Sequence, residues 1–194
     1  HNIECVIVAI EYLKNLAFKI DIHLMPDLPG TTPEMDKESF DFVYNKLYPD
    51  QMKIYPCAVV PWTIIKKWYD NNKWTPMSKE DLFNVMNYGV ETCPDWIRLP
   101  RVIRDIPLEY IEAGNQIMNL RQDLTGNCRD IREREIERHP EYLNQNAKYY
   151  YDKYNDKDYF ISYESWNKVA LFGFIRLRLP KEYSKEYPIL YGKA

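Results

Sequence analysis

The sequence lacks the features that mark a membrane protein, a disulfide-stabilised protein or a clustered metal site. No apolar run approaches the length of a membrane span. The four cysteines, Cys5, Cys57, Cys93 and Cys128, are widely spaced, and no two of them form a C-x-x-C pair. This cysteine usage is typical of a reduced intracellular compartment. We therefore expect the cytoplasm, with the nucleus as the alternative, and no membrane partner.

Excess positive charge is also absent. The chain holds 26 Lys and Arg against 29 Asp and Glu, which gives a formal net charge of -3. A protein of this charge does not grip nucleic acid through bulk attraction, so any such contact must be local. With 45% hydrophobic residues over 194 positions, the chain can still bury a core.

The residues that are present alternate between helical and extended patterns. Apolar side chains recur at helical spacing in four segments, at residues 4–18, 35–48, 63–71 and 78–93. In the last of these, Ser78 and Asp81 have the spacing of a helix-capping box. Extended patterns predict strands at 18–25, 53–60 and 97–104. Strands separated by helices predict an α/β fold with parallel strands and right-handed crossovers.

The first predicted strand runs into the turn "MPDLPG", residues 25–30. Pro26 and Pro29 cannot donate to a sheet ladder, so the strand should end there and open into a shaped loop. Ligands bind at the carboxyl ends of strands in α/β folds. Asp27 could contact loop amides or a ribose hydroxyl in this turn, and its position between prolines favours turn stabilisation.

The amino-acid composition of the sequence changes near residue 108. Residues 108–157 contain interleaved charges and a tyrosine-rich stretch, and we interpret them as a linker. Two short strands are then predicted at 159–164 and 169–179, joined by a tight turn around residues 165–168. A lone hairpin of this kind needs more sheet to pack on. It should form a small sheet separate from the parallel strands.

Six phrases along the chain carry a resemblance to a known family. They are "HLMPDLPG" at 23–30, "KIYP" at 53–56, "RVIRDIP" at 101–107, "GNQIMNLR" at 114–121, "NCRDIREREI" at 127–136, and "FISYES" with "LFGFIRLRL" at 160–179. In their order they resemble the catalytic subunit of Elongator, a radical S-adenosylmethionine (SAM) tRNA acetyltransferase. Each phrase is a weak signal, and the specificity lies in finding all six in order.

The resemblance implies modification of the wobble uridine of tRNA, with acetyl-CoA as the two-carbon donor. It implies the second half of a radical SAM-type partial (βα) barrel over residues 1–107, a linker over 108–157, and the first strands of a GNAT-type acetyltransferase domain over 158–194. The intact family proteins use a 4Fe-4S cluster, SAM and acetyl-CoA, act on tRNA, and assemble with other Elongator subunits. The cluster cysteines and the glycine-rich acetyl-CoA loop of the family are expected outside these residues. The chain alone is therefore not expected to catalyse the reaction.

The candidate RNA or SAM cleft combines cations with an aromatic ring. Lys53 and Tyr55 share one face of the second strand, which suits an anionic, planar substrate such as a nucleotide. The alternative is that Tyr55 is core and Lys53 a solvating edge charge. Arg101 and Arg104 on the third strand could fork onto phosphate. The alternative is a buried pair of Arg104 with Asp105 or Asp27. We expect residues 25–30, 53–56 and 104–107 to lie near one cleft.

Two further groups of residues are candidates in the linker. Arg129 and Arg132 could form a phosphate-binding face, or could belong to a salt-bridged segment, since acidic residues interleave with them. Cys128 and His139 could hold a zinc ion between linker and barrel, but zinc needs about four ligands. A buried thiol and a surface histidine is the favoured interpretation. His23 alternates with apolar neighbours on its strand, and we interpret it as a satisfied barrel residue.

Two functions from different classes therefore stay open. The first is a part of a tRNA-modifying radical SAM acetyltransferase. The second is a non-catalytic RNA-binding or assembly module derived from that family.

Overall fold

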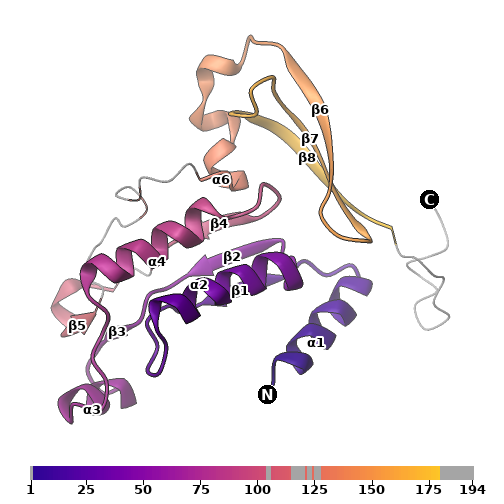
Figure 1. Cartoon of the computed structure of the whole chain (residues 1–194). Coiled ribbons are helices and arrows are strands. Elements are labelled where there is room, and N and C mark those ends of the chain that lie inside the picture. Colours follow the sequence, from indigo (N-terminus) through magenta and orange to yellow (C-terminus); the bar gives the residue numbers. More distant parts are fainter. Residues whose placement is uncertain (1, 104–105, 115–120, 122–123, 125–127, 180–194) are drawn as a thin grey trace.

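The computed structural model describes residues 2–103, 106–114, 121, 124 and 128–179, and all structural statements concern these residues (Figure 1). The helices are α1 (Ile3–Asn15), α2 (Pro33–Phe42), the π-helix η1 (Val43–Leu47), α3 (Ile64–Asp70), α4 (Lys79–Glu91) and α6 (Ile131–Arg134), with 3-10 turns η2 (Leu108–Tyr110), η3 (Ile136–Arg138) and η4 (Pro140–Tyr142). The strands are β1 (Asp21–Leu24), β2 (Gln51–Ile54), β3 (Ala58–Val59), β4 (Arg98–Arg101), β5 (Ala113–Gly114), β6 (Ala147–Lys153), β7 (Asp158–Ser165) and β8 (Leu171–Arg178).

The first sheet contains three parallel strands in the order β1-β2-β4. This confirms that the strands predicted near residues 18, 53 and 97 are parallel neighbours. Asp21 pairs with Gln51, and Lys53 pairs with both His23 on β1 and Arg101 on β4. The sheet therefore brings three polar positions from distant parts of the chain into one row.

The predicted bounds of the second strand, 53–60, are wrong. β2 begins two residues earlier and ends at Ile54, because Pro56 has no N–H to continue the ladder. Beyond β2, the Cys57 amide donates a hydrogen bond to the carbonyl of Pro26 at 2.8 Å. Residues 58–59 form β3, which pairs antiparallel with β5 in a separate two-stranded sheet.

Helices α2 and α4 lie side by side over one face of the β1-β2-β4 sheet (Figure 1). Their apolar faces and the inward side chains of the strands form a buried core. The core includes Phe40, Tyr44, Met52, Ile54, Val85, Met86 and Leu99. The two helices approach closely at Gly89, where an added Cβ would lie 2.5 Å from the ring of Phe40. The Tyr44 hydroxyl also donates to the Gly89 carbonyl, so a side chain at position 89 would force the helices apart.

Local sequence signals set the helix boundaries. The Thr32 hydroxyl accepts from the Met35 amide at 3.3 Å, directly before Pro33 at the start of α2. The predicted cap of α4 is confirmed, since the Ser78 hydroxyl accepts from the Asp81 amide at 3.0 Å. None of the helices in the described ranges is long and apolar enough to cross a bilayer.

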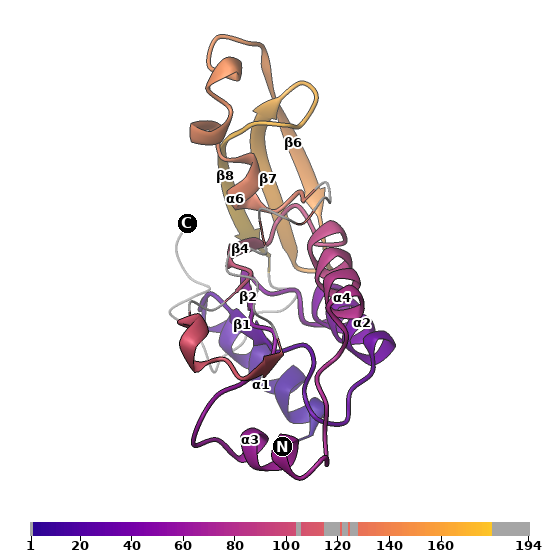
Figure 2. The ribbon, with the colours of Figure 1, turned by 90° about the vertical axis from the view of Figure 1, so that its left-hand side faces the viewer.

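The second sheet is antiparallel, with the order β6-β7-β8, and stands at the opposite end of the molecule from α3 (Figure 2). The predicted hairpin at 159–164 and 169–179 is confirmed as β7 and β8. Its turn is closed by the Lys168 amide, which donates to the Ser165 carbonyl at 2.8 Å. Strand β6 was not predicted, because it lies within the segment interpreted as a linker.

The outer edge of β4 is covered by side chains rather than by another strand. The carboxylate of Asp130, which is fully buried, accepts from the Leu99 amide at 2.8 Å. Arg121 donates to the Leu99 carbonyl at 2.6 Å, and Arg132 donates to the carbonyl of Pro100. These contacts satisfy backbone groups that an open edge would expose.

The same segment attaches the second sheet. Arg134 of α6 and Glu164 of β7 are both almost fully buried and form an ion pair of 2.8 Å. Arg134 also donates to the carbonyls of Arg129 and Asp95 at 2.8 and 2.6 Å. On β8, Arg176 donates to the carbonyls of Asp50 and Trp96, at the amino ends of β2 and β4. Arginines from α6 and β8 therefore join the two sheets, together with the stacked rings of Trp96 and Tyr154.

We expect Glu164→Gln to lower the free energy of unfolding by about 3 kcal/mol, because it leaves the buried Arg134 without its charge partner. Urea unfolding measures this change. The matched control is Arg138→Gln, since Arg138 forms a 4.0 Å pair with Glu133 between exposed side chains. It should cost less than about 0.5 kcal/mol. Equal stability of the two variants would contradict a central role for the buried pair.

Candidate functional site

The face of the β1-β2-β4 sheet that points away from α2 and α4 is polar. Side chains alternate along a strand, so the residues beside the buried Met52 and Ile54 point to the other face. We call this surface the polar sheet face, and its residues are Asp21, His23, Gln51, Lys53, Tyr55 and Arg101. Lys53 and Asp21 are partly exposed and His23 is half exposed, so this polar face is a candidate binding surface.

Lys53 is the centre of a hydrogen-bonded group on the polar sheet face. Its Nζ lies 2.8 Å from Asp21 Oδ2 and 3.2 Å from His23 Nε2. Gln51 Nε2 donates to the same Asp21 oxygen at 2.6 Å. Burial would raise the pKa of Asp21, but the hydrogen bonds from Lys53 and Gln51 and the charge of Lys53 outweigh it and lower that pKa.

An aromatic ring lies beside this charged group. The ring of Tyr55 meets the ring of His23 edge to face, with centroids 5.6 Å apart. Arg101 lies opposite Lys53 in the strand register and is exposed. Lys53, His23 and Tyr55 therefore lie together near the carboxyl end of β2, with Arg101 on the neighbouring strand. Such a set can hold an anion together with a planar ring.

The structure brings together three of the predicted site residues, Lys53, Tyr55 and Arg101. Arg104 lies outside the described residues. Sequence reasoning missed Asp21 and Gln51, although period-2 alternation and the register of neighbouring strands place them beside Lys53. His23 lies on β1 with its side chain 52% exposed, and its Nε2 is within 3.2 Å of Lys53 Nζ, so it has a polar partner.

Asp27 is part of the turn after β1 and not of the polar sheet face. Its carboxylate accepts from the Met77 amide at 3.0 Å, and its own amide donates to the Asp36 carboxylate at 2.7 Å. The residue is buried and has a left-handed backbone with φ of 66°. These contacts support turn stabilisation. Burial raises the pKa of Asp27 to about 6, with a further contribution from the charge of Asp36, and the Met77 amide opposes the shift.

A pocket of about 340 Å³ opens beside this turn. His23 and Met25 line it from β1 and the turn, and Asp36 and Ser39 line it from α2. The pocket lies between the turn and α2 and includes no residue of 53–56, so it is not the cleft predicted between residues 25–30, 53–56 and 104–107. Because His23 also belongs to the polar sheet face, the pocket and the face are adjacent.

The candidate residues of the linker are engaged by protein groups. Arg129 forms two hydrogen bonds of 2.9 and 3.0 Å with the carboxylate of Asp95, and Arg132 binds the carbonyl of Pro100. Their guanidinium groups therefore serve the salt-bridged segment that was the alternative interpretation. Neither residue takes part in the hydrogen-bonded group around Lys53.

Cys128 and His139 also have protein partners. The Cys128 thiol donates to Asp130 Oδ1 at 3.1 Å, and burial raises the pKa of this thiol to about 12. His139 Nε2 lies 2.8 Å from the Glu133 carbonyl oxygen. Within the described part of the chain, no three His, Cys, Asp or Glu side chains are grouped in a way that could hold a metal ion.

Comparison with known proteins finds relatives over nearly the whole chain. The Radical_SAM C-terminal domain family matches residues 49–127. A tRNA uridine(34) acetyltransferase of Methanocaldococcus infernus is 32% identical over 96% of this chain, and Elongator complex protein 3 of Bos taurus is 30% identical over 99% of it. The chain covers 38% of the length of each of these two relatives.

A solved structure supports the same relationship. The archaeal Methanocaldococcus infernus Elp3 with an N-terminal deletion aligns with a TM-score of 0.77 and 31% identity. The alignment covers 96% of this chain and 48% of that chain. The described α/β arrangement is therefore similar to a part of that protein.

The raised pKa of Asp27 predicts a pH-dependent stability. The folded state holds this proton more tightly than the unfolded chain, whose value is near 3.8. The contribution of Asp27 to the stability of the folded state is therefore fully present below pH 3.8, and it is lost as the pH rises through about 6. We expect the free energy of unfolding of Asp27→Asn, relative to that of the wild type, to increase by about 2 kcal/mol between pH 4 and pH 7.

Asn suits this test because it tolerates a left-handed backbone and can still accept from the Met77 amide. Urea unfolding at a series of pH values gives the stability difference between the two proteins. Asp36, whose pKa is also raised by burial, is present in both and largely cancels. A difference that does not change with pH would show that Asp27 is already ionised in the folded state at pH 4.

Proposed function

Because the chain is homologous to the tRNA uridine(34) acetyltransferase and Elongator complex protein 3 family along nearly its whole length, we propose that it forms part of a tRNA-modifying acyltransferase. The proposed reaction is carboxymethyl-type modification of the wobble uridine, with acetyl-CoA as donor and a radical SAM domain. The observation that carries the proposal is the 32% identity with the archaeal enzyme over 96% of the chain. This match includes both the parallel sheet and the antiparallel sheet.

In this proposal, residues 1–107 form the second half of a partial (βα) barrel. Residues 108–157 connect it to the first strands of a GNAT-type acetyltransferase domain at 158–194. The parallel order β1-β2-β4 supports the first assignment, and the β7-β8 hairpin supports the second. Because β6 pairs with β7, the connecting segment contributes a strand to the second sheet.

We assign the polar sheet face to contact with the tRNA substrate. Lys53 and Arg101 supply positive charge for a backbone phosphate, and Tyr55 supplies a ring for a splayed base. Asp21 orients Lys53 through its 2.8 Å contact, and Lys53 in turn lies 3.2 Å from His23 Nε2, whose ring meets that of Tyr55. The chain is acidic overall, so this local grouping of cations is what can attract RNA.

The cofactors of the family fit the chain unequally. The radical SAM match implies SAM and a 4Fe-4S cluster in intact relatives. The four free cysteines do not fit the cluster, since Cys57 and Cys93 are buried, Cys5 is exposed on α1, and the described residues contain no group of metal ligands. The polar sheet face has groups of both signs, Asp21 and Lys53, that fit the ammonium and carboxylate of SAM.

The partners follow from the same relationship. We propose tRNA as the substrate and other Elongator-like subunits as assembly partners, in keeping with the printed name of the bovine relative.

Replacing Lys53 by Ala should weaken tRNA binding about fivefold or more at low salt, because one phosphate contact is lost. The slope of log K against log salt should fall by about 0.9 for each phosphate contact removed. A filter-binding or fluorescence titration with a tRNA anticodon stem-loop over a range of salt concentrations measures both quantities.

Lys67→Ala is the matched control, since Lys67 is exposed on α3, outside the polar sheet face. It should leave affinity and slope close to the wild-type values. Equal tRNA binding by wild type and Lys53→Ala across the titration would exclude this face as the RNA contact. Absence of tRNA binding by the wild type itself would contradict the proposed substrate for this chain.

A further inference from the structure

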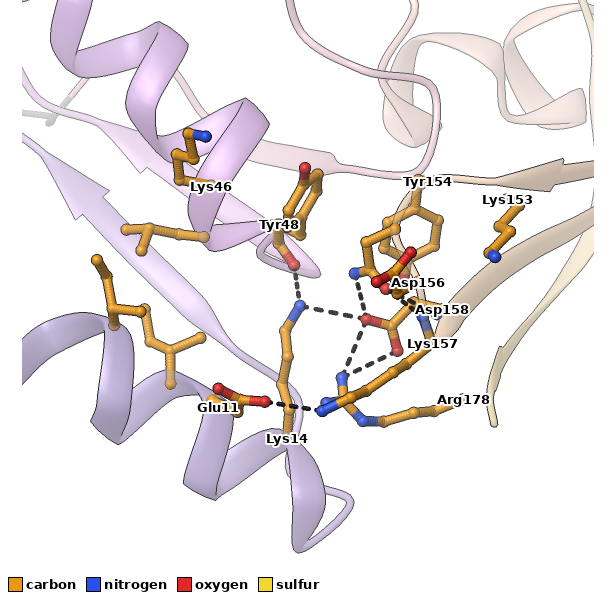
Figure 3. Close-up of a pocket in the computed structure, with 14 residues that line it drawn as sticks. Glu11, Lys14, Lys46, Tyr48, Lys153, Tyr154, Asp156, Lys157, Asp158 and Arg178 are labelled. Atoms are coloured by element: carbon orange, nitrogen blue, oxygen red, sulfur yellow. Dashed lines mark hydrogen bonds and ion pairs between the residues drawn. The ribbon is translucent and has the colours of Figure 1, made fainter. Parts of the chain in front are cut away.

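A second pocket lies where the two sheets meet, away from the polar sheet face. Its volume is about 620 Å³, which is in the range of small-molecule sites. The walls come from α1, the end of η1, the β6-β7 turn and β8, so four separate segments build it (Figure 3). We call it the joint pocket. Ile7, Ile10 and Leu47 make part of its lining apolar.

Positive charge exceeds negative charge in the joint pocket. Five cations line it, namely Lys14, Lys46, Lys153, Lys157 and Arg178, against the three acids Glu11, Asp156 and Asp158. This surplus is local, because the whole chain has a net charge of -3. A concave site with excess positive charge attracts and concentrates anions.

The buried part of the pocket shares one carboxylate between two cations. Arg178 NH1 lies 3.0 Å from both oxygens of Asp158, and Lys14 Nζ lies 3.8 Å from one of them. Burial lowers the pKa of Lys14, and the charge of Asp158 opposes this shift. Arg178 Nε is buried and has no hydrogen-bond partner among the described residues. The cluster therefore keeps a positive surplus and an unsatisfied donor.

Among the described residues, two lysines at the rim, Lys46 and Lys153, have no ion pair with an acid. Lys157, by comparison, is paired with Glu11 at 2.7 Å. In contrast, Lys46 has no hydrogen bond or ion pair with any described residue, and Lys153 makes only a cation–π contact with Tyr159 at 5.8 Å. The two ammonium groups lie on opposite sides of Tyr48 and Tyr154 (Figure 3). They can receive an anion without first breaking an ion pair.

Aromatic rings complete the pocket. Tyr48 and Tyr154 have ring centroids 6.3 Å apart, and Tyr154 stacks on Trp96 at 4.6 Å with an interplanar angle of 13°. Trp96 thus holds Tyr154 in place at the pocket wall. Fixed rings beside free ammonium groups are the elements that recognise a planar base carrying phosphates.

We propose that the joint pocket binds a small phosphorylated ligand with a planar ring, of the nucleoside diphosphate class. The ring packs against Tyr48 and Tyr154, and Lys46 and Lys153, one on each side of these rings, attract the phosphates. The pocket joins α1 to β8, so an occupied pocket adds contacts between the two sheets. This inference does not depend on the tRNA function proposed for the polar sheet face.

The test is calorimetric titration of the full chain with ADP, with adenosine as the probe that lacks phosphate. We expect ADP to bind and adenosine to bind at least about tenfold more weakly, since charge-assisted contacts carry the affinity. Lys46→Gln and Lys153→Gln should each weaken ADP binding about fivefold. Both lysines are exposed, so these variants should keep the fold, which circular dichroism and thermal unfolding verify.

Lys67→Gln serves as the matched control, because it removes an exposed lysine from α3, which does not line the pocket. It should bind ADP like the wild type. The proposal is overturned if ADP does not bind at about 1 mM, if adenosine binds as well as ADP, or if the two pocket variants and the control behave alike. Loss of tRNA binding in Lys46→Gln without any ADP binding would instead make this surface an RNA contact.

Discussion

The buried carboxylate of Asp130 is the contact on which the arrangement of the two sheets depends. One side chain accepts from the Leu99 amide of β4, from Arg121 at 2.7 Å, and from the Arg132 amide that begins α6. It therefore closes a sheet edge and starts a helix at once. The helix in turn directs Arg134 toward Glu164 of the second sheet. A buried carboxylate persists only when several donors compensate its desolvation, and here they come from three segments.

The contacts of Asp130 leave the two faces of the parallel sheet with different surroundings. The face under α2 and α4 is dry and closely packed, and Gly89 sets the distance between the helices. The opposite face carries Lys53 and Asp21 in contact but partly exposed, so its charges remain available to a ligand. The buried apolar side chains and the partly exposed polar side chains therefore lie on opposite sides of the same three strands. The strand register alone produces this separation.

Local sequence signals predicted what depends on neighbouring residues. The prolines after β1 and the Ser78 cap act within a few residues, and the parallel order follows from the alternation of strands and helices. Strand β6 was missed because "AKYYYDK" places tyrosines on both faces and so shows no alternation. The partners of Arg129 and Arg132 could not be predicted, since Asp95 and Pro100 lie more than thirty residues away. Only the folded chain brings these groups together.

The side chains on β4 also determine how the sheet can grow. Their contacts occupy the backbone groups of that strand, so no further strand can be added there without displacing the Asp130 carboxylate. Among the described residues, β1 pairs only with β2, which leaves its other edge open. Extension of the parallel sheet, whether by more of the same polypeptide or by a second molecule, is thus directed to β1. Among the described strands, one edge of the parallel sheet is therefore closed by charged side chains, and the other edge is not paired with a strand.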